Sequence, residues 1–384
     1  MTKPNTTYKP LGDYIRKIDK RNQDLVLTKP MGINIDKQFM PSVANVIGTD
    51  MSNYKLVGKN QFACNLMHVG RDGKIPVAIN TTEKEILVSP AYHVFEIVDK
   101  NALSPDFLMM WFHREEFDRE ASFYTDADVR SGMDFKALME MRIPVPPITE
   151  QRAVVADYEA VARRIAVAKR TIATLQATAQ TLYRKMFVDG IDKENLPEGW
   201  RWGTLGEVCE INPTLSSDRT NEMPFVDMDS LPVAGYFFDN IQRRFYSSGM
   251  KFQNNDVLFA RITPCMENGK AAIVTGLEDC EIAFGSTEFI VMRGRNMKLT
   301  SFLAILVRSE DFRAFAKAQM KGTDGRQRVD ANALKQYKLI IPDKVSLINF
   351  ETQVSLIFND MYLHSKEIEK LTEIQTIILS GMGR

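Results

Sequence analysis

The chain has 384 residues with 49 basic and 49 acidic side chains, so its formal net charge is zero, and its length suffices for two or three domains. The balanced charge excludes a strong overall attraction to nucleic acid, although a neutral protein can still carry a local basic face. Four cysteines without CxxC spacing argue against a disulfide framework, and no apolar run of about 18 residues is present that could span a bilayer. We expect reduced thiols and a cytoplasmic location.

The sequence pattern of residues 1–147 predicts a globular part of mixed α and β structure. Ile86–Val88 and Val94–Val98 are short and rich in β-branched or aromatic residues, which is typical of strands. Ser104–Phe117 has helical periodicity. A proline-marked strand, Arg142–Pro147, closes this part. We expect it to form the first domain.

A long amphipathic helix is predicted for residues 148–190. Its apolar residues alternate in steps of four and three over four heptads, which makes a narrow seam typical of a coiled coil. A helix in a globular core usually shows a wider, less regular stripe. The seam consists of Val154, Tyr158, Val161, Ile165, Ala168, Ile172, Leu175, Ala179, Leu182 and Met186.

Residues 191–344 predict a second globular part, entered through a polar linker at 191–200 that contains a proline and a glycine. It closes on a proline-marked strand, as the first part does. The expected strands are Asp256–Ala260, Ala272–Thr275, Phe289–Met292 and Lys338–Pro342, and the expected helix is Leu299–Gln319.

Residues 345–384 predict a second long helix that repeats the first. Every seam position lies 196 residues after its counterpart in the first helix. This spacing indicates a duplicated helix. The second seam consists of Phe350, Val354, Ile357, Met361, His364, Ile368, Leu371, Gln375, Ile378 and Met382.

The duplication also includes the globular parts. Four matches recur at the same offset of 196 residues: Gly73-Lys74 with Gly269-Lys270, Arg130 with Arg326, Leu138 with Leu334, and Pro146 with Pro342. Phe107 and Phe117 match Phe302 and Phe312 one residue short of it. A period this long is not that of a solenoid. It indicates two copies of a unit that consists of a globular part and a long helix.

This order of elements predicts an α+β fold with two globular parts separated by two long helices. Neither helix can bury its seam alone, so we expect the two to pair. A chain in the order globular part, helix, globular part, helix allows antiparallel pairing, which would give the molecule approximate twofold symmetry. The pair would separate two similar globular parts by a fixed distance. DNA is a natural target, because successive half-sites lie about 34 Å apart per helical turn.

The chain resembles the specificity subunit of type I restriction-modification enzymes. The resemblance lies in the duplicated layout, in Leu11-Gly12-Asp13, in Ile-Pro-Val-Pro-Pro-Ile-Thr-Glu-Gln at 143–151, and in Leu-Pro-Glu-Gly-Trp at 196–200. It implies that each globular part is a target recognition domain that reads half of a split site in double-stranded DNA. It implies that the two helices set the spacer and dock two adenine methyltransferase subunits. It leaves open whether ATP-dependent endonuclease or translocase subunits also join.

The residue patterns themselves predict no catalytic site. No GxxxxGK[ST] run is present, no GxGxxG follows a strand, and the only Asn-Pro motif, at Asn212, lacks the aromatic residue of amino-methyltransferases. The four histidines show no metal-ligand spacing. We therefore predict a non-catalytic subunit with no catalytic residues, no metal ligands and no cofactor.

Basic and amide side chains in turn-rich loops are the candidates for DNA contact. Arginine can pair with guanine and asparagine or glutamine with adenine, while lysine mostly neutralises phosphate. The alternative is that each of these residues simply solvates a loop. The candidates are His68, Arg71, Lys74, Arg130, Arg261, Thr263, Asn268, Lys270, Arg326, Gln327 and Arg328.

Two other functions stay open at this point. The chain could be a coiled-coil scaffold with two protein-binding heads and no role at DNA, or, less in keeping with the pattern, a stand-alone nuclease. Affinity for duplex DNA that falls as salt rises and depends on sequence would distinguish a DNA-reading subunit from a scaffold.

Overall fold

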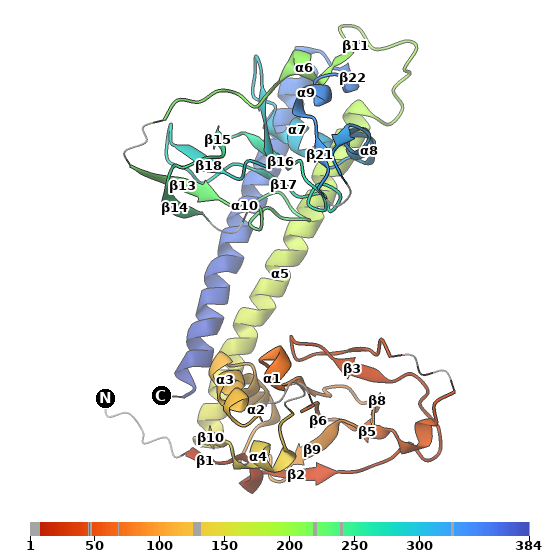
Figure 1. Ribbon diagram of the computed structural model, residues 1–384, viewed down its shortest axis with the longest axis vertical. Coiled ribbons are helices and arrows are strands. Elements are labelled where there is room, and N and C mark those ends of the chain that lie inside the picture. Colours follow the sequence, from red (N-terminus) through yellow and green to blue (C-terminus); the bar gives the residue numbers. More distant parts are fainter. Residues whose placement is uncertain are drawn as a thin grey trace. The chain divides into compact units, whose positions relative to one another are not determined.

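The computed structural model describes residues 8–44, 46, 48–67, 69–125, 132–217, 221–238, 241–323 and 326–383. The chain divides into two compact units, which we call the first unit (Met1–Ile165 with Lys370–Arg384) and the second unit (Ala166–Glu369). Each unit contains one globular part and portions of both long helices, α5 (Ile148–Phe187) and α10 (Lys344–Gly381) (Figure 1).

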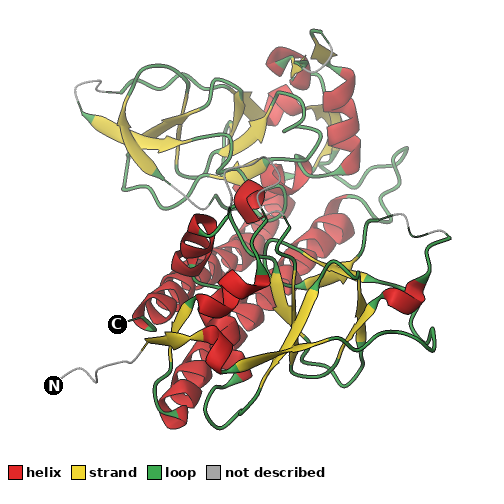
Figure 2. Cartoon of the chain, turned by 60° about the horizontal axis from the view of Figure 1, so that its bottom comes forward, coloured by secondary structure: helices red, strands yellow, loops and turns green. Residues whose placement is uncertain are grey.

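The globular part of the first unit has two four-stranded sheets and a two-stranded pair. One sheet has the order β2-β9-β6-β7, the other the order β4-β3-β8-β5, and β1 pairs with β10. The strands are short and loops connect them (Figure 2). The elements are β1 (Tyr8–Pro10), a 3-10 turn (Leu11–Asp13), β2 (Ile15–Ile18), β3 (Met31–Ile33), β4 (Phe39–Pro41), a 3-10 turn (Met51–Asn53), β5 (Lys55–Val57), β6 (Gln61–Cys64), α1 (Val69–Asp72), β7 (Val77–Ile79), β8 (Ile86–Val88), β9 (His93–Ile97), α2 (Pro105–Phe112), α3 (Glu115–Phe123), α4 (Phe135–Glu140) and β10 (Arg142–Pro144).

The globular part of the second unit repeats this topology. Its sheets have the orders β12-β19-β16-β17 and β14-β13-β18-β15, β11 pairs with β22, and β20 with β21 forms an additional pair. A parallel pairing also recurs, as β3 with β8 in one unit and β13 with β18 in the other. The elements are β11 (Arg201–Thr204), α6 (Leu205–Val208), β12 (Cys209–Ile211), β13 (Glu222–Val226), β14 (Gln242–Phe245), β15 (Met250–Gln253), β16 (Val257–Ala260), β17 (Ala271–Ile273), β18 (Ile282–Gly285), β19 (Phe289–Gly294), α7 (Thr300–Leu306), α8 (Glu310–Ala318), β20 (Met320–Lys321), β21 (Arg328–Val329), α9 (Ala331–Leu334) and β22 (Lys338–Ile341).

These sheets and helices confirm the α+β fold with two sheet-containing parts and two long helices. All ten predicted seam positions of each long helix are buried or half-buried. In the first unit, Val155 near the start of α5 shares a core with Met382 at the end of the chain. In the second unit, Ala179 near the end of α5 shares a core with Phe350 near the start of α10. Within each unit the two helices run antiparallel (Figure 1).

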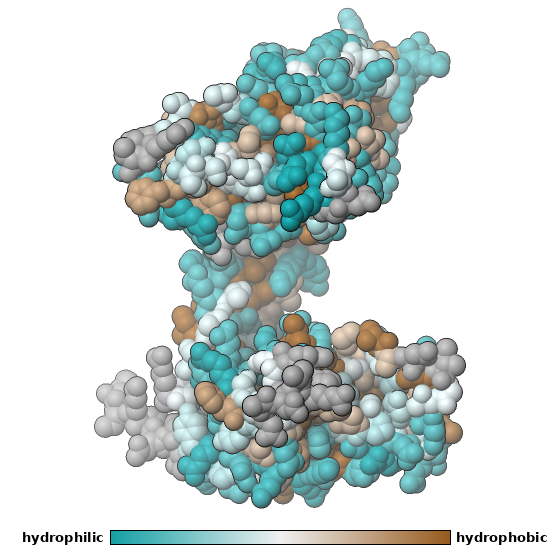
Figure 3. All heavy atoms as spheres, viewed as in Figure 1, coloured by the Kyte–Doolittle hydropathy of each residue, from teal (hydrophilic) through white to brown (hydrophobic). Residues whose placement is uncertain are grey.

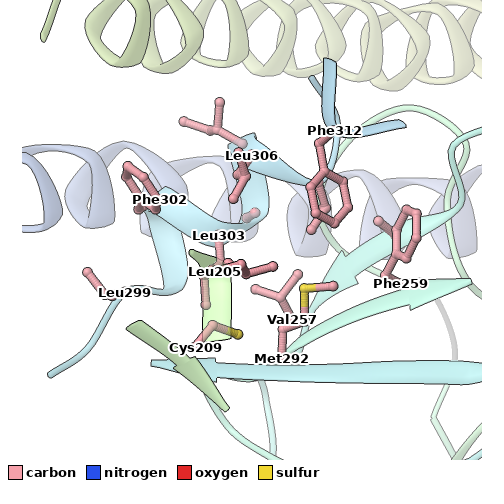
Figure 4. Packing of buried hydrophobic residues seen from close by; sticks show 14 of the residues in the cluster. Leu205, Cys209, Val257, Phe259, Met292, Leu299, Phe302, Leu303, Leu306 and Phe312 are labelled. Atoms are coloured by element: carbon pink, nitrogen blue, oxygen red, sulfur yellow. The ribbon is translucent and has the colours of Figure 1, made fainter. Parts of the chain in front are cut away.

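The core of the second unit joins the long helices to α7 and to a sheet. Phe187 of α5 lies 5.0 Å from Phe350 of α10 and 5.5 Å from Phe302 of α7, measured between ring centroids. Figure 4 shows Leu303 of α7 beside Leu205 and facing Val257 and Met292 of the sheet. Aromatic rings bury large apolar areas, so this cluster stabilises the attachment of the globular part to the helices.

Both predicted helices of the globular parts are broken into two. Ser104–Phe117 becomes α2 and α3, and Leu299–Gln319 becomes α7 and α8. Ser309 has an extended backbone, and its hydroxyl accepts the N–H of Phe312, so it starts a new helix. In each unit the break separates a helix that is buried on nearly all sides, α2 or α7, from an amphipathic helix, α3 or α8. Helical spacing of apolar residues on both sides of each break made the two helices look like one in the sequence.

A buried polar side chain from each long helix meets the N-terminal end of a globular-part helix. Gln151 of α5 accepts the N–H of Ser104 at 2.8 Å, just before α2. Glu351 of α10 accepts the N–H groups of Ser301 (3.1 Å) and Phe302 (2.8 Å) in the first turn of α7. Burial raises the pKa of the Glu351 carboxyl above its ordinary value, although the two backbone donors oppose this shift. At the start of the globular-part helix, the second unit therefore uses the carboxyl group of Glu351, whereas the first unit uses the amide of Gln151.

Replacing Glu351 by Gln should make stability less dependent on pH. With the folded pKa raised above 4.5, the unfolded state loses the proton first, so the free energy of unfolding falls as pH rises from 4.5 through the raised value. Glu351→Gln removes this loss, so the variant should gain stability relative to wild type between about pH 4 and pH 7. Urea unfolding across this range measures the difference.

Glu369→Gln is the matched control, because Glu369 is an exposed glutamate of the same helix that pairs with Lys366. It should not reproduce the change. If Glu351→Gln instead lost stability relative to wild type as pH rose, the carboxylate would be stabilised by the fold and the assignment would be wrong.

Candidate nucleic-acid interface

In the second unit, main-chain hydrogen bonds bring two candidate segments together. The loop between β16 and β17, residues 261–270, lies against the β20–β21 hairpin. The N–H of Thr263 donates to the carbonyl of Gln327 (3.1 Å), and the N–H of Val329 donates to the carbonyl of Arg261 (2.8 Å). Ile262 and Arg328 form an isolated bridge. Arg261, Thr263, Gln327 and Arg328 are therefore neighbours, although about 65 residues separate them in sequence.

Glu288 orders the basic side of this cluster. Both of its carboxylate oxygens accept from Nε of Arg328, at 2.8 and 3.0 Å, and its carbonyl accepts the N–H of Arg261 at 2.9 Å. The bond to Glu288 raises the pKa of the Arg328 guanidinium, which thus stays charged. Nε of Arg261 is buried and has no hydrogen-bond partner in the described part of the chain. The neighbouring Arg326 is exposed.

Lys270 is placed differently from the other candidates. Only 15% of its side chain is exposed, and its ammonium group donates to the carbonyl of Met228 at 2.9 Å and lies 3.4 Å from Asp229. Asn268 is exposed and its N–H donates to the carbonyl of Pro264. Lys270 thus holds its loop to residues 228–229, while Asn268 lies on the surface of the loop.

The first unit contains the same junction of two segments. The N–H of Met133 donates to the carbonyl of Leu66 at 2.8 Å, in the position that Val329 and Arg261 occupy in the second unit. Lys74 is exposed at the end of the loop between β6 and β7. His68 and Arg130 lie outside the described residues, as does the side chain of Arg71, whose backbone belongs to α1. The structure thus gives no side-chain position for three of the four candidates in this unit.

Arg243, Arg244 and Glu288 of the second unit were not among the candidates predicted from the sequence. Arg243 and Arg244 lie on the exposed strand β14, where Arg243 pairs with Glu281 at 2.6 Å and Arg244 lies 4.3 Å from the centre of the Phe225 ring. The signal was present, because two arginines precede the exposed Phe245. The role of Glu288 carried no local signal, because its partner Arg328 is 40 residues away.

The described residues offer no candidate metal site. Among them, no group of three or more His, Cys, Asp or Glu side chains could hold a metal ion. None of the described helices combines the length and apolar character that crossing a membrane requires. Hydrophilic residues dominate the face shown in Figure 3.

Two curated relatives match part of this chain. No family model matches it. It is 35% identical over 140 residues to the type I restriction enzyme EcoAI specificity subunit of Escherichia coli, and 31% identical over 153 residues to the EcoEI specificity subunit of the same organism. The matches cover 35% and 38% of this chain, but only 24% and 26% of the relatives. The resemblance to type I specificity subunits is confirmed.

A solved structure extends this resemblance to the whole fold. The crystal structure of the type I restriction-modification S subunit from M. genitalium covers 100% of this chain with a TM-score of 0.62, and the chain covers 98% of it. Sequence identity is 12%, so this likeness concerns the fold alone. The matched sequence segments span about a quarter of the curated specificity subunits. The chain thus has local sequence similarity to type I specificity subunits and a fold similar to that of a type I S subunit.

Proposed function

We propose that this chain is the DNA sequence-specificity subunit of a type I restriction-modification complex. It recognises a split site in double-stranded DNA and docks two adenine methyltransferase subunits. The observation that carries this proposal is the repeated junction of two loops, Leu66 with Met133 and Arg261 with Val329, on two copies of one topology. Similarity to the EcoAI and EcoEI specificity subunits supports it.

The proposal assigns one half-site to each globular part. Residues 1–147 form the first target recognition domain and 191–344 the second, with the linker at 191–200. Long helices at 148–190 and 345–384 connect them. In the second domain Arg261, Arg326 and Arg328 can pair with guanine or phosphate, and Asn268 and Gln327 with adenine. Thr263 and Lys270 shape the loop. In the first domain the candidates for DNA contact are Lys74 and the undescribed His68, Arg71 and Arg130.

The long helices act as the ruler in this proposal. At 1.5 Å per residue, the 40 residues of α5 correspond to a length of about 60 Å. A paired helix of this length fixes the distance between whatever its ends carry. The helices also offer docking surface, because Leu356, Leu363 and Ile377 of α10 are 69%, 57% and 67% exposed. Exposed apolar residues on one helix suit a protein partner.

Chemistry in this scheme belongs to the partners. The chain positions DNA, and the docked methyltransferases flip an adenine out of the duplex and methylate it. The same sequence reading is available to ATP-dependent endonuclease subunits where these join the complex.

Binding to duplex DNA tests the proposal directly. Fluorescence anisotropy of the full chain with its methyltransferase subunits should give an affinity that falls steeply as salt rises and depends on DNA sequence. Binding without any sequence preference, or no binding by a soluble and assembled complex, would favour the scaffold with two protein-binding heads. DNA cleavage or modification by the chain alone would revive the nuclease alternative.

Exposed and tethered cations of the same unit should differ in their effect on binding. Arg326→Gln removes an exposed cation from the loop junction, so it should weaken binding to the cognate duplex by about tenfold. Lys270→Gln should change the salt dependence of DNA binding less than Arg326→Gln does, because the Lys270 ammonium group already donates to the Met228 carbonyl and to Asp229. Lys338→Gln, an exposed cation on β22, is the matched control and should leave affinity unchanged. Equal effects of all three variants would contradict the assignment of the loop.

Lengthening both long helices should change the spacer and nothing else. Duplicating residues 162–168 of α5 and 365–371 of α10 adds seven residues, about 10.5 Å, to each helix and keeps the seam in phase. Mapping methylation by the resulting complex should then give unchanged half-sites with a longer gap.

A seven-residue insertion into the linker at 191–200 is the control, because it lengthens neither helix. It should leave the gap as it is. Altered half-sites after the double insertion would show that the helices do more than set distance.

A further inference from the structure

A guanidinium group lies beneath the 261–270 loop of the second unit. Arg308, between α7 and α8, donates from Nη1 to the carbonyls of Val233 (2.8 Å) and Gly269 (3.3 Å), and from Nη2 to those of Ala271 (2.7 Å) and Pro232 (3.3 Å). Within the described residues, no acidic side chain forms an ion pair with it. The Arg308 guanidinium therefore joins main-chain carbonyls at the end of the loop, Gly269 and Ala271, to those of Pro232 and Val233.

Arg313 of α8 holds the same loop two residues earlier. Its Nη2 donates to the carbonyl of Glu267, and its guanidinium carbon would lie 3.4 Å from a Cβ at Gly269. Lys317, one turn later, pairs with the Glu267 carboxylate at 2.8 Å. The α7–α8 pair thus holds the main chain next to Asn268 from two sides.

The first unit anchors its loop with a group of opposite charge. Asp118 of α3, only 6% exposed, accepts the N–H of Ile75 at 3.1 Å, directly after Lys74. Its carboxylate also accepts from the ammonium group of Lys37 at 2.8 Å. Burial lowers the pKa of Lys37, and the Asp118 charge opposes this shift. A buried pair thus fixes the end of the loop between β6 and β7.

The two anchors occupy equivalent positions of the duplicated unit. Asp118 and Arg313 lie 195 residues apart and each follows one of the matched phenylalanines, Phe117 and Phe312. In the first unit Asp118 accepts a backbone N–H of the loop, whereas in the second unit Arg313 donates to a backbone carbonyl of the loop. The duplication has thus kept a contact from the helix pair to the loop and reversed its polarity.

Neither arrangement is explained by stability alone. Removing charges from water costs several kcal/mol per ion, and well-packed apolar groups of similar volume often do as well as a buried pair. Arg308 and Arg313 are partly buried and donate to main-chain carbonyls rather than to a carboxylate. The hydrogen bonds of Asp118, Arg308 and Arg313 are directional, so each of them fixes the position of a peptide group.

We propose that Asp118 in the first unit, and Arg308 with Arg313 in the second, are positioning residues that fix the two DNA-reading loops independently. The inference rests on the proposed function, since it takes these loops as the readers. It goes further by assigning specificity to residues that need not touch DNA. A substitution at one of these positioning residues should therefore lower sequence discrimination at one half-site and leave discrimination at the other unchanged.

The test measures discrimination at each half-site, defined as the ratio of Kd for a duplex with one changed base to Kd for the cognate duplex. The full chain with its methyltransferase subunits is used throughout. Arg313→Met should lower discrimination about tenfold at one half-site only, because a displaced loop loses its base contacts. Lys37→Met with Asp118→Leu replaces the buried pair by apolar groups of similar size, so the unit stays folded, and it should affect only the other half-site.

Matched variants and a second readout keep the result specific. Arg201→Gln and Arg16→Gln break exposed ion pairs of the second and first unit, with Glu207 and Glu96, and should change neither half-site. Arg313→Lys should restore part of the discrimination, since lysine can still donate to the Glu267 carbonyl. Hydrogen exchange should be faster in the loop of each anchor variant and unchanged elsewhere.

Two results would overturn the inference. One is an equal loss at both half-sites, and the other is unchanged discrimination although the loop amides exchange faster. A wild-type complex that shows no preference at either half-site would instead refute the proposed function, and this inference with it.

Discussion

Burial of the seams of α5 and α10 is the constraint on which both units depend. A single long helix with a narrow apolar seam cannot bury that seam by itself, so each helix requires the other. Each unit encloses a stretch of both helices, running antiparallel, in the core of its globular part. In the second unit the rings of Phe187, Phe302 and Phe350 join the helices to the sheet through α7. Within each unit the globular part and the paired helices therefore share one hydrophobic core.

Much of this fold could be predicted, because its signals are local or periodic. The seams follow a spacing of four and three residues, and repetition at a distance of 196 residues reveals the two copies. The breaks at Arg114 and Ser309 could not be predicted from periodicity, because apolar residues at helical spacing lie on both sides of them. Both residues have an extended backbone, and Ser309 also caps the helix that follows it.

The candidate interface was predictable in its segments but not in its side chains. Matching Gly73-Lys74 with Gly269-Lys270 pointed to the loop of the second unit that the main chain brings to the β20–β21 hairpin. It gave no sign that Lys270 would be tethered to Met228 or Arg328 to Glu288. Such partners lie 40 or more residues away, and charge alone does not indicate which cations stay free. The zero net charge likewise conceals where basic side chains gather.

The most direct measurement of the central claim is a map of methylated adenine in a host that has no adenine methylation of its own. The chain would be produced together with its methyltransferase subunit, and the genome read for methyladenine. Two fixed half-sites separated by a gap of constant length are the predicted result, because the proposal assigns one half-site to each of the two similar units. Methylation at an undivided motif, or none at all by a soluble and associated complex, would contradict the account.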